Sequence, residues 1–454
     1  MLERGRDGRA ALARSLALIA LLGAPHALAD IAVQGVGDAS FGVTDNAQSA
    51  PATPLEDGPS RGAGAFLLLS PGIVFATVSS QAEQRLSYRY EYNLSLADSH
   101  ATTSVNRVEY VGFFDLTQRL QLLLGGMASV SSGYSALSFV GTAAGGLSPV
   151  PAGTAALLGL TADETLQWDI AEGWRGYEGV TFSVQTPLFE TEAPTTLSPR
   201  LRLGAERAFR FNAVGVEARA EYTVISEGVN LAGQPTGQQR QLVTAAVATY
   251  RQDFGYLFNG SAEAGVLRVQ RLNSGEGQFY PTGAAALAYA TETGAAQLSY
   301  RHTVTTNALL GQFSLIDEVR LHGGVPLTRK GELFCAANAA YQRGRLLGEE
   351  LEQGIDLEIW LADVSLGYRA NDYLTLGLRY QHVDQYSSKE PPVRGLPVSY
   401  YRNDVMIGAT VVFPPERKMP RPYRAPTRVD GSDELRGEPV PEQSLPRSPT
   451  TQPG

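Results

Sequence analysis

The sequence predicts an all-β fold, a transmembrane antiparallel β-barrel of about 18 strands, from two observations. Segments of roughly a dozen residues alternate apolar and polar side chains, which is the period of a strand exposed to different surroundings on its two faces. The connections between these segments alternate between short and long. Barrels of bacterial outer membranes combine such strands with tight turns at one end and longer loops at the other.

The first element is a secretory signal over residues 1–29. A basic start is followed by the apolar run SLALIALLG at 15–23 and by Ala27-Leu28-Ala29, an A-x-A cleavage site. We therefore expect the barrel to occupy residues 30–413, beginning at Asp30. The alternative is an uncleaved anchor, but this apolar run is too short to span a membrane as a helix.

The barrel segments follow in order, and alternating side chains justify each of them. The pattern is weakest in the first, sixth and fourteenth segments, so 16 strands is the competing count. The predicted strands are 31–44, 64–75, 84–96, 104–114, 119–132, 164–175, 180–190, 199–207, 213–225, 239–250, 255–270, 279–290, 295–306, 312–322, 332–345, 356–369, 373–385 and 399–413.

The segment 84–96 shows the two-faced pattern most clearly. Leu or Tyr occupies every even position from 86 to 96. Arg89, Glu91 and neutral polar residues occupy the odd positions between them. A helix would spread these charges around its whole surface, so a strand is the better interpretation. A wall with lipid outside and water inside requires one apolar and one charged face.

The connections place the ends of the chain. Tight turns at 115–118, 176–179, 208–212, 251–254, 291–294 and 370–372 alternate with mostly longer, polar loops. With the tight turns in the periplasm, an even number of strands places both termini there too. The longest loop, 133–163, is rich in Gly, Ala and Pro, and we expect either an infolded constriction or an external loop. A soluble β-sandwich gives no reason for this segregation.

The last strand and the residues after it have opposite characters. The strand 399–413 ends on Phe413, which resembles the terminal aromatic signal read by the barrel-assembly machinery of Gram-negative bacteria, an expected partner during insertion. Residues 414–454 hold ten of the 26 prolines and few apolar residues, so a disordered periplasmic tail is predicted. The tail is either a tether to the envelope or to a partner, or a tolerated extension.

Several kinds of chemistry are disfavoured. The histidines show no pairs at metal-ligand spacing, and the one cysteine, Cys335, cannot form an internal disulfide. The net charge of −9 argues against nucleic acid as a partner. His382 and Asp384 share the parity of the lipid-facing residues in their strand, which argues against a catalytic pair. We therefore expect neither an enzyme nor a cofactor.

Charged residues on the polar face are the candidate functional residues, expected to line the lumen. Opposite charges there either select permeating solutes or only hydrate and rigidify the wall. The candidates are Arg89, Glu91, Glu109, Arg202, Glu217, Arg219, Glu221, Asp363, Arg379 and Asp404, with Arg107, Arg200, Glu206, Arg301 and Arg369 on the same face.

Tyrosines near strand ends predict aromatic girdles at the membrane surfaces, where an amphipathic ring lies at headgroup level. Ordinary strand propensity is the alternative explanation. The residues concerned are Tyr256, Tyr280, Tyr300, Tyr368, Tyr373, Tyr400 and Tyr401.

Three short motifs carry a resemblance: FGVTDN at 41–46, LSPG at 69–72 and LSYRY at 86–90. The chain resembles uncharacterised outer-membrane β-barrel proteins of Gram-negative deltaproteobacteria. That resemblance implies an alternative function as an export port for secreted polysaccharide, with polysaccharide or periplasmic export components as partners.

The sequence thus predicts an integral protein of the outer membrane, surrounded by its lipid. Its main predicted function is a channel that passes hydrophilic solutes through a charged lumen. A structural barrel of the envelope that binds partners through its loops or tail is the remaining alternative.

Overall fold

The computed structural model describes most of the segment predicted to form the barrel. The described residues are 30–46, 62–96, 102–132, 157–187, 195–229, 235–255, 257–291, 294–307, 312–347, 356–388 and 399–415. The predicted signal at 1–29, the tail from residue 416 onward and residues 133–156 of the longest loop lie outside these ranges. The expectations for those three segments therefore stay predictions.

Eighteen long strands form one antiparallel sheet, and a separate pair of two-residue strands lies in one connection. The strands are β1 (Asp30–Thr44), β2 (Gly64–Val78), β3 (Ala82–Ser95), β4 (Thr103–Thr117), β5 (Leu120–Ser132), β6 (Leu157–Ala171), β7 (Trp174–Pro187), β8 (Thr196–Ala208), β9 (Asn212–Ile225), β10 (Gly228–Val229), β11 (Pro235–Thr236), β12 (Gln239–Asp253), β13 (Phe258–Arg271), β14 (Gly277–Ala290), β15 (Ala295–Asn307), β16 (Gln312–Pro326), β17 (Leu333–Leu347), β18 (Asp356–Arg369), β19 (Leu374–Ser387) and β20 (Tyr400–Phe413).

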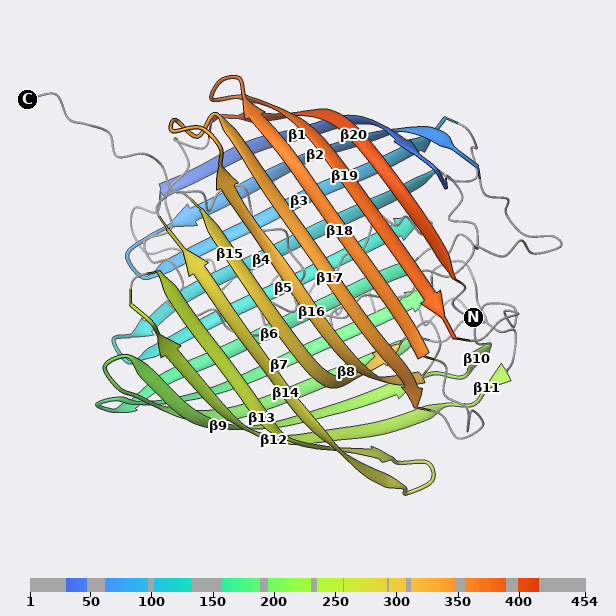
Figure 1. The fold of residues 1–454 in the computed structure, drawn as a ribbon. Helices are drawn as coiled ribbons and strands as arrows, with labels where there is room; N and C mark the ends of the chain where they lie inside the picture. The colour runs from blue at the N-terminus through green and yellow to red at the C-terminus, as the bar shows by residue number, and fades with distance from the viewer. Residues whose placement is uncertain are drawn as a thin grey trace, which may run out of the picture.

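The sheet closes on itself between its first and last strands. β1 pairs with β20 from Gly35 opposite Phe413 to Thr44 opposite Asp404, and it also pairs with β2. The long strands pair with their neighbours along the chain, so the barrel is a closed series of hairpins whose strands slant around it (Figure 1). The prediction of 18 strands is confirmed, and the count of 16 is wrong.

The two ends of the barrel differ in their connections. At the tight-turn end, strands are joined by short turns such as 79–81, 118–119 and 370–373, and β1 begins and β20 ends there. In the last of these turns, Asn371 Oδ1 accepts the N–H groups of Tyr373 (2.8 Å) and Leu374 (2.9 Å), as in an Asx turn. The opposite end, which holds the connection 133–156, is called the long-loop end below.

One predicted turn is wrong. The segment 176–179 was expected to be a tight turn, but it lies inside β7. The turn is at 172–173, where Gly173 has a φ of 74°. Gly176 serves packing instead: a Cβ there would lie 2.5 Å from an indole carbon of Trp168 on β6. As a result β6 begins at Leu157, inside the predicted loop 133–163.

The two faces of the wall differ in their side chains. Apolar residues on the outer face are open to the surroundings, and Val216, Val266, Phe279, Ile407 and Phe413 are each more than half exposed. The inner face instead holds the buried polar and charged side chains, with buried apolar residues such as Leu267 and Ile359 among them. This is the reverse of a water-soluble protein, whose apolar side chains are mostly inside. No helix in the described part of the chain is long and apolar enough to cross a membrane.

Candidate functional site

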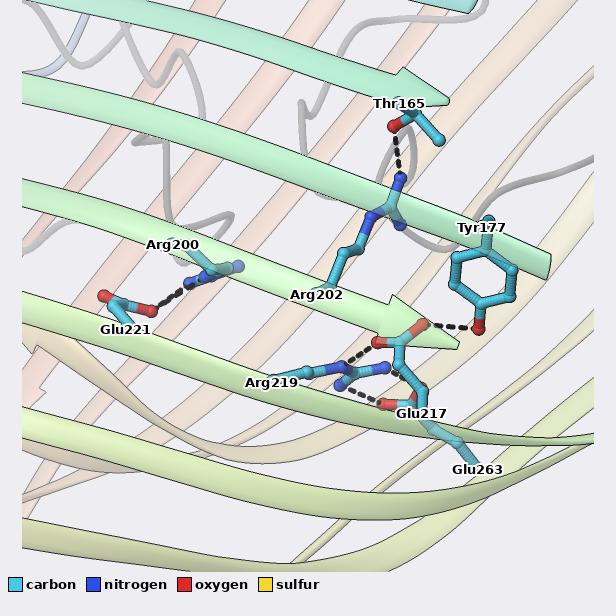
Figure 2. Close-up of polar contacts among 8 residues, drawn as sticks. All are labelled: Thr165, Tyr177, Arg200, Arg202, Glu217, Arg219, Glu221 and Glu263. Carbon is cyan, nitrogen blue, oxygen red and sulfur yellow. Dashed lines mark hydrogen bonds and ion pairs between the residues drawn. The ribbon is translucent and has the colours of Figure 1, made fainter. Parts of the chain in front are cut away.

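A cluster of charged and polar residues lies on the inner face of β6 to β13 (Figure 2). Alternation along each strand turns these side chains inward, and the register brings neighbouring strands into line: Arg200 lies opposite Glu221, and Gly204 opposite Glu217. The charged cluster consists of Thr165, Tyr177, Arg200, Arg202, Glu217, Arg219, Glu221 and Glu263.

Arg219 is the centre of the charged cluster. Its Nη2 and Nη1 atoms lie 2.5 Å and 3.0 Å from the two carboxylate oxygens of Glu263, a bidentate contact across β12. Its Nε donates to Glu217, on the same strand. Tyr177 Oη donates to the other oxygen of Glu217 at 2.6 Å. One guanidinium thus holds two carboxylates, and a tyrosine fixes one of these from β7.

The remaining contacts extend the charged cluster toward β6. Arg200 Nε and Nη2 donate to Glu221 Oε2 at 2.8 Å and 2.5 Å. Arg202 Nη2 donates to the hydroxyl of Thr165 at 2.7 Å. Tyr177 lies against Gly204, where a Cβ would be 2.2 Å from its ring, so the glycine makes room for the tyrosine that reaches Glu217. Glycine in these strands therefore helps to position the site.

A second group lies nearer the tight-turn end of the same wall. Glu206 on β8 accepts from Arg251 on β12 at 2.6 Å and lies 3.6 Å from Arg175 on β7. Arg175 also lies 3.3 Å from Asp169 across the β6–β7 hairpin. These ion pairs join four strands, so the wall from β6 to β13 is linked by charges along much of its height.

The opposite wall also carries ion pairs, but they are more isolated. Glu318 on β16 contacts Arg301 at 2.5 Å and Arg320 on its own strand. Arg379 Nε donates to Asp363 at 2.8 Å. Across the closure of the barrel, Asp38 accepts from Arg89 and from Thr410.

A different surface lies on the inner face of β16, β18 and β19 near the long-loop end. We call it the apolar patch: Ile316, Leu357, Ile359, Leu361 and Val383. The register places Leu361 opposite Val383, and both neighbours of Ile359 across the strands, Gln342 and Gln385, are buried too. Ile359 is 1% exposed and Val383 is 0% exposed. By contrast, the side chain of Arg379, on the same face of β19 but nearer the tight-turn end, is 45% exposed.

All ten candidate residues lie on the inner face, but the structure does not bring them into one site. Arg202, Glu217, Arg219 and Glu221 belong to the charged cluster. Asp363 pairs with Arg379, Asp404 lies 2.8 Å from Arg402, and Glu109 lies 3.5 Å from Arg107. Arg89 pairs with Asp38, and Glu91 lies two positions along from Arg89 on β3. That these residues line a path for solutes remains a prediction.

Sequence reasoning missed several residues of the site. Glu263 was overlooked although it stands between Ala262 and Ala264, a signal that was available, and Glu318 was overlooked in a segment where Asp317 beside it obscures the alternation. Tyr177 was missed because it was assigned to a turn. The apolar patch was also missed, since a uniformly polar inner face was expected.

The tyrosine prediction holds only in part. Tyr368, Tyr373 and Tyr401 are exposed near strand ends, the position that girdles require, whereas Tyr300 is exposed in the middle of β15. Tyr280 is a correction, because its register partner Leu267 is buried on the inner face, and its hydroxyl donates to Gln278 there. Phe279 takes the outer position instead. Tyr256 and the side chain of Tyr400 lie outside the described part of the structure.

Within the described ranges, no group of three or more His, Cys, Asp or Glu residues could hold a metal ion. His382 and Asp384 lie on the outer face, as predicted, and His382 Nδ1 lies 2.8 Å from Asn403 Oδ1.

Comparison with known proteins gives similarity of fold alone. No protein-family model and no curated protein matches the sequence. OccK9 (OpdG) of Pseudomonas aeruginosa is 13% identical, with a TM-score of 0.43 over 85% of this chain and 99% of that one. OccK2 (OpdF) of that organism, in complex with glucuronate, is 12% identical, with a TM-score of 0.43 over 85% of this chain and 98% of that one. The ferric-catecholate import receptor Fiu of E. coli K12 is 10% identical, with a TM-score of 0.41 over 84% of this chain and 81% of that one. At these scores, the similarity does not indicate what this chain binds or transports.

Proposed function

We propose that this protein is an outer-membrane channel that passes hydrophilic solutes through its charged interior. One observation carries the proposal: the barrel exposes mostly apolar side chains on its outer face and holds most of its ion pairs on its inner face. An apolar outer face suits lipid, because every strand has its hydrogen-bonding partners within the closed sheet. The polar inner face suits water and polar solutes.

The number of strands supports passage through the barrel. Barrels of 16 to 18 strands enclose more space than the side chains of their own strands fill, and porins of this size leave an aqueous channel. The paired charges fit a path for neutral or zwitterionic solutes, because each guanidinium of the cluster has hydrogen-bonding partners beside it. A solute with both donors and acceptors exchanges water for these groups without facing a field of one sign.

The orientation is part of the proposal. The tight-turn end faces the periplasm, because outer-membrane barrels have short periplasmic turns and longer outer loops. The end of β20 is then periplasmic, and Phe413 at that end is 68% exposed on the outer face. This is where an assembly factor that reads a terminal aromatic residue would contact the chain.

Single-channel recording in a planar bilayer tests the proposal. We expect the purified barrel to give stable conductance steps in potassium chloride, with a reversal potential near zero under a salt gradient because the inner charges are paired. A matched variant replaces residues 133–156 with a short Gly-Ser linker. Greater conductance in that variant would place a constriction in this segment.

Conductance only after that replacement would favour a gated export port over an open channel. If neither protein conducts although both are folded barrels, the channel proposal fails. The structural role in the envelope would then be the better hypothesis.

A further inference from the structure

A row of four ionisable side chains crosses the outer face on β15 to β18. The register places His302, Asp317, Arg343 and Glu358 directly opposite one another on successive strands. His302 Nδ1 lies 2.7 Å from Asp317 Oδ1, which also accepts from Tyr300 Oη at 2.8 Å. Arg343 Nε lies 3.8 Å from Glu358 Oε1. We call these four residues the outer charge row.

The centre of the row is open to the surroundings. The side chains of Asp317 and Arg343 are 45% and 52% exposed, although each has a neighbour in its own chain. Charged groups on the outer face of a membrane barrel are costly away from the interface, so their position needs a physical reason.

Depth in a bilayer does not supply that reason. The residues of the row lie two to five positions from the strand ends at the long-loop end. At the same distance from that end, the outer positions of β5 to β9 are uncharged: Ala128, Val130, Leu160, Ala162, Phe182, Val184, Pro199, Leu201, Ala220 and Tyr222. A lipid headgroup layer surrounds the whole barrel and would favour charges on both sides. Outer-face charges at this depth also include Arg268 on β13 and Asp384 on β19, so they gather on one side of the barrel, and the unbroken row across β15 to β18 is the centre of that side. The row therefore indicates something that contacts this side of the barrel.

We propose that a second copy of this chain docks on the outer face of β15 to β18. A twofold axis parallel to the barrel axis, running between β16 and β17, places Asp317 opposite Arg343 of the other copy and Arg343 opposite its Asp317. The sequence of charges across these strands is thus complementary to itself, as an isologous interface requires. Only a second copy of the chain necessarily carries the complementary order of charges.

The slant of the strands decides which residues meet. Because the strands of each barrel slant in the same sense, the rows of two facing copies cross (Figure 1). Asp317 and Arg343 lie next to the crossing point, whereas His302 and Glu358 lie further out and orient them from within their own copy. The interface therefore depends on two equivalent Asp–Arg contacts.

The surface below the row allows close approach. Tyr341 on β17 packs against Trp360 on β18, with ring centroids 4.3 Å apart. Further toward the tight-turn end, the outer positions of β17 are Ala339 and Ala337, both exposed. Small side chains let two elements approach closely in a membrane, where dispersion contacts and polar pairs drive association.

Charge reversal tests the interface through the mass of the protein–detergent complex. We expect the wild type to be a dimer by light scattering in a mild detergent. Arg343→Glu places like charges together twice, and we expect it to weaken association by at least about tenfold. The double variant Asp317→Arg/Arg343→Asp exchanges the two charges. It places opposite charges together again and should restore the dimer. Arg268→Glu, on the outer face of β13, is the control and should leave the dimer unchanged.

The same question can be asked in lipid bilayers, which removes any effect of detergent. A fluorophore on Lys330→Cys, in a turn at the tight-turn end, with Cys335→Ser, should bleach in two steps for the wild type and in one step for Arg343→Glu. One-step bleaching of the wild type, or a dimer that persists in Arg343→Glu, would overturn the proposal. Loss of co-purified lipid in Arg343→Glu without a change in mass would also overturn it and assign the row to a headgroup. Conductance is recorded separately, so the channel proposal can fail independently.

Discussion

The inner face of the barrel is built in two ways. In the charged cluster, the polar groups satisfy one another across neighbouring strands, as Arg219 does with Glu217 and Glu263. In the apolar patch, Ile359 and Val383 are almost completely buried although they face the interior. The charged wall is therefore complete within the sheet and can remain wet, whereas the apolar patch behaves like the core of a soluble protein. Substitutions in the two regions should differ accordingly.

The largest effect is expected in the apolar patch. Ile359→Asp would bury a carboxylate between Gln342 and Gln385, and we expect a loss of several kcal/mol of folding free energy, because a buried charge without a partner is costly. Folding into lipid vesicles, followed by the heat-dependent shift in gel mobility, measures the loss. Ile359→Val is the control, with an expected cost of about 1 kcal/mol. Equal urea midpoints for the two variants would show that the patch is not a core.

The next largest effect is expected at the centre of the charged cluster. Arg219→Leu removes the partner of Glu217 and Glu263, and we expect it to destabilise the barrel by about 3 kcal/mol. It also leaves excess negative charge on the inner face, so the reversal potential in a salt gradient should shift toward cation selectivity. Arg219→Lys keeps the charge but loses the bidentate contact, so it should be destabilised without the shift. An unchanged reversal potential in Arg219→Leu would show that this wall does not face the conducting path.

A smaller effect is expected at Tyr177. Tyr177→Phe removes the hydrogen bond to Glu217, which keeps its contact with Arg219, and we expect a loss of about 1.5 kcal/mol in unfolding free energy. The charge is unchanged, so ion selectivity should stay the same. Tyr250→Phe is the matched control, because that hydroxyl donates to neutral Gln252 on the outer face. A cost as large for Tyr250→Phe would mean that the ring, not the charged partner, matters.

The smallest effect on stability is expected at the edge of the charged cluster. The pair Arg200–Glu221 is partly exposed, so a double-mutant cycle with Arg200→Gln and Glu221→Gln should give a coupling of about 0.5 kcal/mol. Unfolding midpoints in urea at two salt concentrations measure it, and high salt should reduce it further. A coupling of several kcal/mol would mean that the pair is as desolvated as the apolar patch.

Particular residues show how far the sequence alone could go. Alternation assigned Arg89, Glu217 and Asp363 to the polar face, because parity within one strand is local information. Sequence reasoning failed at 176–179, which was assigned to a turn although its two glycines lie within a strand and leave room for Trp168 and Arg202. It also failed for Tyr280, because Phe279 and Tyr280 are adjacent aromatics and only the register with β13 decides which one faces outward.

By itself, the sequence determined that the fold is an antiparallel barrel of about 18 strands, the contrast between the two ends and the parity of most charged residues, whereas only the closed sheet decided between 16 and 18 strands. The features that the sequence determined follow from periodicity and turn composition, which are properties of neighbouring residues in the chain. The tertiary structure alone decided that Arg219 lies between Glu217 and Glu263, that Asp38 reaches Arg89 and Thr410, and that Ile359 and Val383 share a buried patch. These contacts join different strands, so they depend on register and barrel closure, and a shift of one residue would turn each side chain to the other face.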